Sequence, residues 1–396
     1  MKKDWTYKKL GDCLSYIKNG ANIKQTKGAT GIPITRIETL SGGVFNRDRL
    51  GYADITDVKK YESFYLETGD LLLSHINSKT YIGRTVMYSQ EAEEKIIHGM
   101  NLLRLKVIKE HLTPAFFCYY AKSDRFKADI VKIRKDAVNQ SSICISDIVQ
   151  ITIPVPPISI QESIVRELDA IHGILEKKQE QLRELDNLAQ AIFYEMFGDP
   201  ITNPKQWEVK KLGEVCDVRD GTHDSPKYLP SSEYILITSK NIVNGEIDFS
   251  VSNYINREDF EAINRRSRVD VGDIIMPMIG TIGNPIIIKP TEKKFCIKNV
   301  ALIKFANAEE VINVYIRELL DSPSYIGFLK SINQGGTQKF IALGTIRKLS
   351  IPLPPLSLQQ SFAAKIEAIE AQKQAVQQSI REVEALLAER MDYYFS

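Results

Sequence analysis

The sequence lacks the usual signals of a membrane, secreted or disulfide-stabilised protein. Its 396 residues contain five cysteines and no C-x-x-C pair, which argues against a zinc site or a disulfide framework and fits a reducing compartment. No run of eighteen apolar residues occurs, and the opening sequence MKKDWTYKKLGD has no apolar signal core. We therefore expect a cytoplasmic protein that neither spans a membrane nor is secreted.

The motifs of several enzyme classes are also missing. There is no G-x-x-x-x-G-K-[ST] phosphate loop, no H-E-x-x-H sequence and no glycine-rich loop opening a βαβ unit. The Asn/Asp-Pro-Pro-aromatic motif of amino-methyltransferases does not occur either. The five histidines are isolated from any spaced set of metal ligands. We expect no catalytic residue, no metal site and no cofactor in this chain.

The net charge of +2 conceals an uneven distribution. Residues 1–157 carry 24 basic and 17 acidic side chains, whereas residues 158–199 carry 4 basic and 9 acidic ones. Residues 200–355 are weakly basic and residues 356–396 weakly acidic. Basic surfaces suit a polyanion, and acidic helices would repel one and meet protein instead.

A long amphipathic helix is predicted over residues 159–197. Apolar residues recur there in steps of four and three, with an interruption at Lys178, which is the heptad pattern of a helix that packs along another helix. Ser159 and Glu162 form a potential capping box, and Pro156-Pro157 precede them.

The same seam recurs near the end of the chain, 198 positions later, so we expect the two helices to pack on each other. Each helix follows a similar proline-rich motif, IPVPP at residues 153–157 and IPLPP at residues 351–355. The expected helix-pairing residues are Ile164, Leu168, Ile171, Leu182, Leu185, Phe362, Ile366, Ile369, Val376, Ile380 and Val383.

The segments that precede these helices also repeat. Trp5 and Trp207 open matching segments, and Gly69-Asp70 followed by an apolar run reappears as Gly272-Asp273. These turns and short apolar runs predict a mixed α/β (α+β) unit in each half. We expect four regions with an internal two-fold repeat: a globular part over 1–157, a helix within 158–199, a second globular part over 200–355 and a helix within 356–396.

The two copies differ most in polar, basic loops that could grip or read nucleic acid. Lysine and arginine can neutralise phosphates, and asparagine, glutamine and arginine can form paired hydrogen bonds with base edges. Any one of these residues could equally be an ordinary surface group. The candidates are Lys24, Lys27, Arg36, His75, Asn77, Lys79, Arg84, Gln140, His223, Lys227, Lys240, Asn241, Arg265, Arg266, Thr281, Asn284, Gln338 and Lys339.

Along essentially its whole length the sequence resembles the DNA-specificity subunits of type I restriction–modification systems. The resemblance rests on the two proline-rich motifs, with Gln161 and Gln359 just inside the helices that follow them. Gly69-Asp70 and Gly272-Asp273 are similar to the recurrent core motif of that family. Gly221-Thr222 resembles its early Gly-Thr loop, and the first copy has Gly20-Ala21 at this place.

The resemblance implies two target-recognition domains, separated by two long antiparallel coiled-coil helices that act as a spacer. Each domain would read half of a bipartite, asymmetric site in double-stranded DNA. The partners would be two methyltransferase (modification) subunits, for adenine methylation, and translocating restriction subunits. S-adenosylmethionine, ATP and Mg²⁺ would belong to those partners. An orphan DNA-modifying enzyme and a coiled-coil scaffold without DNA binding remain the alternatives.

Overall fold

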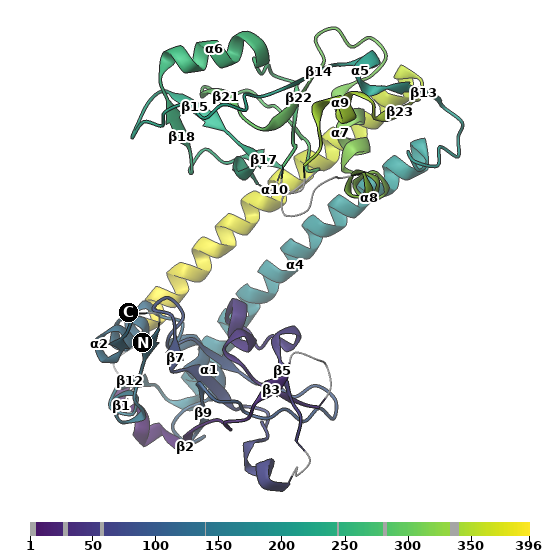
Figure 1. Ribbon diagram of the computed structural model, residues 1–396. Helices are drawn as coiled ribbons and strands as arrows, with labels where there is room; N and C mark the ends of the chain where they lie inside the picture. Colours follow the sequence, from purple (N-terminus) through teal and green to yellow (C-terminus); the bar gives the residue numbers. More distant parts are fainter. Residues whose placement is uncertain are drawn as a thin grey trace. The chain divides into compact units, whose positions relative to one another are not determined.

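The structure is a computed structural model that describes residues 5–26, 31–55, 59–138, 140–243, 245–279, 283–332 and 340–396. They fall into two compact units, one made of 1–178 with 379–396 and the other of 179–378. Each unit contains a globular part and a portion of two 40-residue helices, α4 (Ile158–Phe197) and α10 (Leu356–Phe395), shown in teal and yellow in Figure 1. The units are described one at a time.

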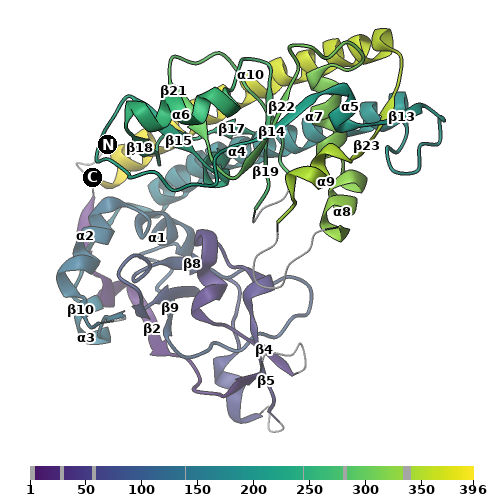
Figure 2. The same cartoon turned by 45° about the horizontal axis from the view of Figure 1, so that its top comes forward.

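The first unit is built on a four-stranded antiparallel sheet in the order β2-β9-β6-β8. The strand β6, which lies between β9 and β8 in this sheet, is buried along its whole length because both faces of the sheet are covered. Leu71 and Leu73 face a core that includes residues of α1 and α2, which lie beside the sheet in Figure 2, and Leu72 faces a second core. The strands are β2 (Leu14–Asn19), β6 (Leu71–Ser74), β8 (Thr85–Met87) and β9 (Leu102–Val107), and the helices are α1 (Pro114–Tyr120), α2 (Asp124–Ile133) and α3 (Ile145–Ile148).

Short strands and turns complete this unit. β1 (Thr6–Lys9) pairs with β12 (Thr152–Val155), the strand that leads into α4. Two three-stranded sheets have the orders β3-β5-β4 and β10-β11-β7. Their strands are β3 (Gln25–Thr26), β4 (Ile32–Ile34), β5 (Gly51–Ala53), β7 (Ile76–Asn77), β10 (Lys135–Asp136) and β11 (Ser141–Ser142). The 3₁₀ helices are η2 (Leu10–Cys13), η3 (Ile37–Gly43), η4 (Arg47–Arg49) and η5 (Lys59–Phe64).

The two long helices run antiparallel within this unit, because the start of α4 contacts the end of α10. Glu167 accepts hydrogen bonds from Arg390 and from the Tyr394 hydroxyl, the latter at 2.6 Å. Phe395 packs edge-on against Phe116, with 5.5 Å between ring centroids, and is 1% exposed. The last turn of α10 is therefore part of the first globular core. Of the predicted pairing residues here, three are buried and two half-buried: Ile164, Leu168 and Ile171, and Ile380 and Val383.

The second unit repeats this plan. Its main sheet has the order β14-β22-β19-β20, which matches β2-β9-β6-β8 position by position. The strands are β14 (Asp217–Asp220), β19 (Ile274–Pro277), β20 (Ile286–Ile287) and β22 (Val300–Lys304). The other strands are β13 (Glu208–Lys211), β15 (Tyr234–Ile237), β16 (Ile242–Val243), β17 (Glu246–Ile247), β18 (Asn253–Ile255), β21 (Lys294–Ile297) and β23 (Ser350–Leu353). The helices are α5 (Leu212–Val215), η6 (Ser239–Asn241), α6 (Arg257–Ser267), α7 (Asn313–Asp321), α8 (Pro323–Ser331) and α9 (Leu343–Arg347).

Aromatic side chains join the long helices to the second globular part. Phe193 and Phe197 of α4 pack against Phe362 of α10, with ring centroids 5.8 and 5.0 Å apart, and both also contact Tyr315 of α7. The end of α4 thus meets the start of α10, so these helix portions are antiparallel as well. The predicted pairing residues in this unit are buried, except for the half-buried Leu182: Leu185, Phe362, Ile366, Ile369 and Val376.

The predicted start of the first long helix is wrong by one residue. α4 begins at Ile158, so Ser159 lies inside the first turn and is not its N-cap. The carbonyl of Pro157 already accepts hydrogen bonds from the N–H groups of Ile160 and Gln161. The chain therefore turns into the helix directly after the two prolines. Of the residues that the structure describes, none belongs to a helix long and apolar enough to cross a membrane.

The repeated Gly-Asp motif forms a turn closed by a buried charge. The Asp70 carboxylate accepts a hydrogen bond from the Glu67 N–H at 2.7 Å and lies 2.7 Å from the Arg104 guanidinium on the neighbouring strand. In the second unit Asp273 accepts from the Asp270 N–H at 2.8 Å and pairs with Lys304 at 2.6 Å. Gly69 and Gly272 have φ values of +94° and +89°, a conformation that L side chains rarely adopt. The motif is thus explained by the entry of β6 and β19 into the sheet.

Replacing Arg104 by methionine should destabilise the protein by about 3 kcal/mol, because it leaves the buried Asp70 carboxylate without its closest cation. The side chains of Asp70 and Arg104 are only 2% and 3% exposed. Lys127→Met is the matched control, since Lys127 pairs with Asp124 on the exposed surface, and it should cost less than 1 kcal/mol, on the order of a surface ion pair. Urea unfolding of the variants measures both values. A loss for Arg104→Met of less than about 1 kcal/mol, as expected for the control, would show that the Asp70–Arg104 pair stabilises the protein no more than a surface ion pair does.

Candidate nucleic-acid interface

In the first unit the small sheet β10-β11-β7 brings two polar loops together. The chain leaves the buried strand β6 at His75, and β7 then pairs with β11, whose Ser141 lies opposite Asn77. β11 also pairs with β10, and the Ile143 N–H donates to the His75 carbonyl at 2.9 Å. The loop around residues 75–81 and the loop around residues 134–142 therefore lie side by side, although about 60 residues separate them in the sequence.

A carboxylate organises the cations of these loops. Asp136 lies 3.1 Å from the Lys79 ammonium and 3.1 Å from the Arg134 guanidinium. It also accepts a hydrogen bond from the Ser141 hydroxyl at 2.6 Å. The hydrogen bonds from Ser141 and Lys79 lower the pKa of Asp136, so it is ionised at neutral pH. Two cations from different loops, the exposed Lys79 and the half-buried Arg134, are thereby held next to each other.

The other candidates in these loops have different surroundings. Gln140 is exposed. Asn77 donates to the Ser74 hydroxyl at 2.9 Å and accepts from the Ser78 N–H at 2.8 Å. Arg84 donates to the Leu40 carbonyl at 3.1 Å and lies over the Tyr81 ring, 4.5 Å from its centroid. His75 is buried, and burial lowers its pKa, so its imidazole is neutral and is not a phosphate-binding cation.

Lys24 and Arg36 belong to a different part of the first unit. They flank the strands of the β3-β5-β4 sheet, where Lys24 is exposed and Arg36 lies 3.5 Å from the Glu38 carboxylate. Lys27 lies outside the described residues. The structure thus places the first-copy candidates in two groups, of which the group on β10-β11-β7 is held together by strand pairing.

The second unit has an equivalent backbone hydrogen bond between the corresponding loops. After β19, Ile279 forms a bridge with Phe340, and the Ile341 N–H donates to the Met278 carbonyl at 2.9 Å. The latter bond corresponds to that between Ile143 and His75. Asn284 is exposed and has a left-handed φ of +51°. Three candidates in these loops lie outside the described residues: Thr281, Gln338 and Lys339.

In the second unit, another group of candidates surrounds Asp220, at the end of β14. The His223 ring donates through Nε2 to Asp220 Oδ2 and through Nδ1 to Asn299 Oδ1, both at 2.9 Å. Arg266, near the end of α6, pairs with the other oxygen of Asp220. The side chain of Asp220 is 8% exposed, while those of His223 and Arg266 are 58% and 63% exposed. A buried carboxylate thus holds two exposed cations.

The charge state of His223 follows from this geometry. Both of its ring nitrogens lie 2.9 Å from side-chain oxygen atoms, and the protonated imidazolium form has a donor for each of these oxygens. The hydrogen bonds to Asn299 and Asp220 raise the pKa of His223, although burial and the nearby Arg266 oppose the shift. Burial works against the charge on Asp220, but hydrogen bonds from His223 and Arg266 lower its pKa. The group therefore places a permanent cation, Arg266, and a titratable one, His223, on a single carboxylate.

The remaining second-copy candidates are divided between surface and interior. Lys227, Lys240 and Arg265 are exposed. Asn241 is 3% exposed, and its amide bonds to the chain around it. It accepts from the Thr238 N–H and donates to the carbonyls of Asp248 and Val251. Because its amide bonds within its own loop, we do not include Asn241 in the proposed interface.

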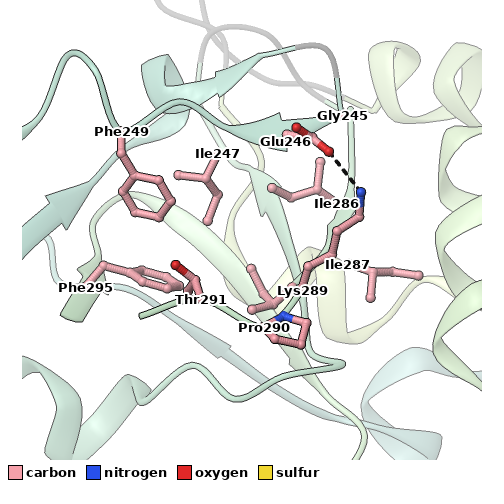
Figure 3. A pocket seen from close by; sticks show the side chains of 11 residues that line it. Gly245, Glu246, Ile247, Phe249, Ile286, Ile287, Lys289, Pro290, Thr291 and Phe295 are labelled. Carbon is pink, nitrogen blue, oxygen red and sulfur yellow. Dashed lines mark hydrogen bonds and ion pairs between the residues drawn. The ribbon is translucent and has the colours of Figure 1, made fainter. Parts of the chain in front are cut away.

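An apolar pocket of about 200 Å³ lies in the second unit, lined by residues of β17, β20 and the chain around them (Figure 3). Ile247, Phe249 and Phe295 contribute to its wall, and an ion pair between Lys289 and Glu246 at 2.9 Å lies beside it. None of the candidate residues lines this pocket. Within the described ranges, no group of three or more His, Cys, Asp or Glu side chains is arranged to hold a metal ion. The candidate interface is made by the exposed candidates, such as Lys79, Gln140, His223 and Arg266, and excludes the buried His75 and Asn241.

Sequence reasoning missed the two organising carboxylates, Asp136 and Asp220. It selected cations and amides by type and so passed over acids. The available signal was weak: Asp136 directly follows Arg134-Lys135, and Asp220 directly precedes the turn that carries His223. Neither spacing by itself predicts an ion pair.

The architecture defines a duplicated protein in which each unit offers basic loops on a shared scaffold. Comparison with known proteins gives the same answer. The sequence matches the family described as "Type I restriction modification DNA specificity domain" over residues 2–185 and again over residues 204–385. The chain belongs to this family, whose members are specificity subunits and are not catalytic.

Individual relatives agree with this assignment. A sequence from Methanocaldococcus jannaschii named "Putative type I restriction enzyme MjaX specificity subunit" is 30% identical over 93% of this chain and 87% of its own length. The EcoKI specificity subunit of Escherichia coli is 23% identical over 52% of this chain and 45% of its own length. The S subunit of a type I system from M. genitalium has the same fold, with a TM-score of 0.53 at 13% identity, and covers 98% of this chain and 95% of its own.

DNA affinity should fall as the pH rises from about 6 to about 9, because His223 loses its positive charge above its raised pKa. The sign follows from the direction of the shift: His223 is cationic below its folded pKa, which lies above the ordinary value of about 6.5. Fluorescence anisotropy with a labelled DNA duplex, at constant ionic strength, measures this dependence.

His223→Asn should flatten the pH profile, whereas His111→Asn, a change in the first unit away from this group, should retain it. An unchanged profile in His223→Asn would show that His223 does not contribute its charge to DNA binding.

Proposed function

We propose that this chain reads a bipartite, asymmetric site in double-stranded DNA, with each globular part reading one half. Family membership supports the DNA-specificity role. The observation that carries the finer proposal is the pairing of one sheet plan, β2-β9-β6-β8 and β14-β22-β19-β20, with different polar groups on it. The first part offers Lys79, Arg134 and Gln140, and the second offers His223 and Arg266.

In this proposal residues 1–157 and 200–355 are the two target-recognition domains, and the helices within 158–199 and 356–396 are the spacer. Cations such as Lys79 and Arg266 would contact phosphates, and amides such as that of Gln140 would contact base edges. The acidic helices suit contacts with protein more than with DNA. Lys227, Lys240 and Arg265 are further candidates for phosphate contacts.

The proposed partners are two methyltransferase subunits, which would methylate adenines in the site, and translocating restriction subunits. S-adenosylmethionine, ATP and Mg²⁺ would be bound by those partners. We further propose that the protein acts in the cytoplasm. The absence of a phosphate loop and of a methyltransferase motif in the sequence supports this division of labour.

Exchange of one globular part tests the proposal directly. Replacing residues 200–355 by the corresponding part of a relative should change one half of the methylated site and leave the other half unaltered. The measurement is a genome-wide map of methylated adenines in cells that express the partner subunits with either chain. The wild-type chain is the reference, and a strain without the chain is the control. A change in both halves of the site would contradict independent reading.

The purified chain alone should transfer no methyl group to DNA from labelled S-adenosylmethionine, because it would contribute specificity and not chemistry. Adding the methyltransferase subunits should restore transfer at the bipartite site. Methylation by the chain alone, at a rate that survives rigorous purification, would contradict the assignment of the chemistry to its partners.

A further inference from the structure

A buried glutamine links the first globular part to its long helix. Gln161, in the first turn of α4, is fully buried, with 0% exposure. Its side-chain oxygen accepts a hydrogen bond from the Thr113 N–H at 2.8 Å. Its side-chain nitrogen donates to the carbonyls of His111 and Pro156, at 2.9 and 2.8 Å. Three separate segments therefore meet at a single side chain: the loop before α1, the proline-rich motif and the first turn of α4.

The second unit repeats every one of these bonds. Gln359 is also fully buried, and its oxygen accepts from the Ile312 N–H at 3.1 Å. Its nitrogen donates to the carbonyls of Glu310 and Pro354, both at 2.9 Å. Thr113 and Ile312 are the N-cap residues of α1 and α7. Each glutamine thus ties the start of a long helix to the start of a helix of the globular part.

The other contacts at these junctions are hydrogen bonds further along α4 and a set of aromatic contacts. The Tyr119 hydroxyl of α1 donates to Asp169 of α4 at 2.6 Å, and the hydroxyl groups of Tyr194 of α4 and Ser324 of α8 are hydrogen-bonded at 3.1 Å. In the first unit Phe116 and Tyr120 of α1 pack against Phe395, and in the second Tyr315 of α7 packs against Phe193 and Phe197. Such apolar contacts stabilise the junction but are not directional. Hydrogen bonds weaken steeply when their angle is distorted, and a buried backbone group that loses its partner destabilises the folded state. The three bonds of each glutamine therefore restrict how a globular part can tilt on its helix.

We propose that Gln161 and Gln359 are positioning residues that fix each recognition domain on its helix and thereby limit the protein to one gap length between half-sites. The inference rests on the proposed function, since it requires two half-sites. The glutamines are remote from the candidate interface in the contacts they make, so they affect where a half-site is read and not which bases are read.

The experiment uses the full chain in complex with its methyltransferase subunits. The substrates are DNA duplexes that contain both half-sites, as mapped for the wild type, with the native gap or a gap one base pair shorter or longer. Gln161→Met and Gln359→Met remove the three hydrogen bonds and keep the side-chain volume. Each should raise methylation at the altered gaps, relative to the native gap, by about tenfold, with the half-site bases unchanged. The control is Gln360→Met, which changes the exposed neighbour of Gln359 and should behave like the wild type.

Folded methionine variants that keep the gap preference of the wild type would overturn the proposal. If a methionine variant does not fold, Gln161→Asn and Gln359→Asn provide the test, because asparagine keeps the amide but is one methylene too short to make all three bonds. They should relax the gap preference in the same direction, and a wild-type preference would again overturn the proposal. Failure of the proposed function itself would be visible separately, since the wild-type complex would then methylate no bipartite site.

Discussion

Each compact unit is completed by a helix segment from a distant part of the chain. In the first unit Tyr394 and Phe395, at the end of α10, belong to the same core as Leu71 and Leu103 of the main sheet. In the second unit Phe362, at the start of α10, packs on the aromatic residues at the end of α4. Burial of a phenylalanine side chain contributes roughly 2–3 kcal/mol. The sharing of α4 and α10 between two cores is thus the constraint on which both units depend.

Because α4 and α10 are shared between two cores, their register must be fixed, and polar contacts between the two helices do this. Lys373 lies where an apolar seam residue would be expected, and its ammonium is 2.8 Å from Asp186 of α4 and 3.0 Å from Glu370. Burial opposes the charge on Lys373, but these carboxylates raise its pKa. Glu167, Arg390 and Tyr394 form a comparable polar group in the first unit. Directional bonds of this kind specify register, which apolar contacts alone leave loose.

The sequence was sufficient to predict the repeat, the mixed α/β class and both long helices, because each is encoded by hydrophobic periodicity or by a repeated sequence motif. It was less informative where tertiary contacts decide. Steps of four and three residues from Leu185 lead to Ile192 and Met196 as the last seam positions. Both are half-buried, whereas Phe193 and Phe197 are buried at 1% and 3% exposure. At this end α4 also contacts Tyr315 of α7, and no periodicity within α4 reveals that neighbour. Asn241 and His75 were selected for their chemistry, but burial could not be inferred from their polar surroundings in the sequence.

Because Phe395 fills part of the first core, the first unit cannot attain its final packing while only the preceding residues exist. During synthesis the sheet β2-β9-β6-β8 and helix α1 would emerge early, with the aromatic surface of Phe116 and Tyr120 still exposed. The second unit, whose segments 179–378 are contiguous, would be available in full before residues 379–396 are made. Of the two units, the one whose globular part is translated earlier is therefore completed later, and its apolar surface must be kept from self-association until residues 379–396 have been made.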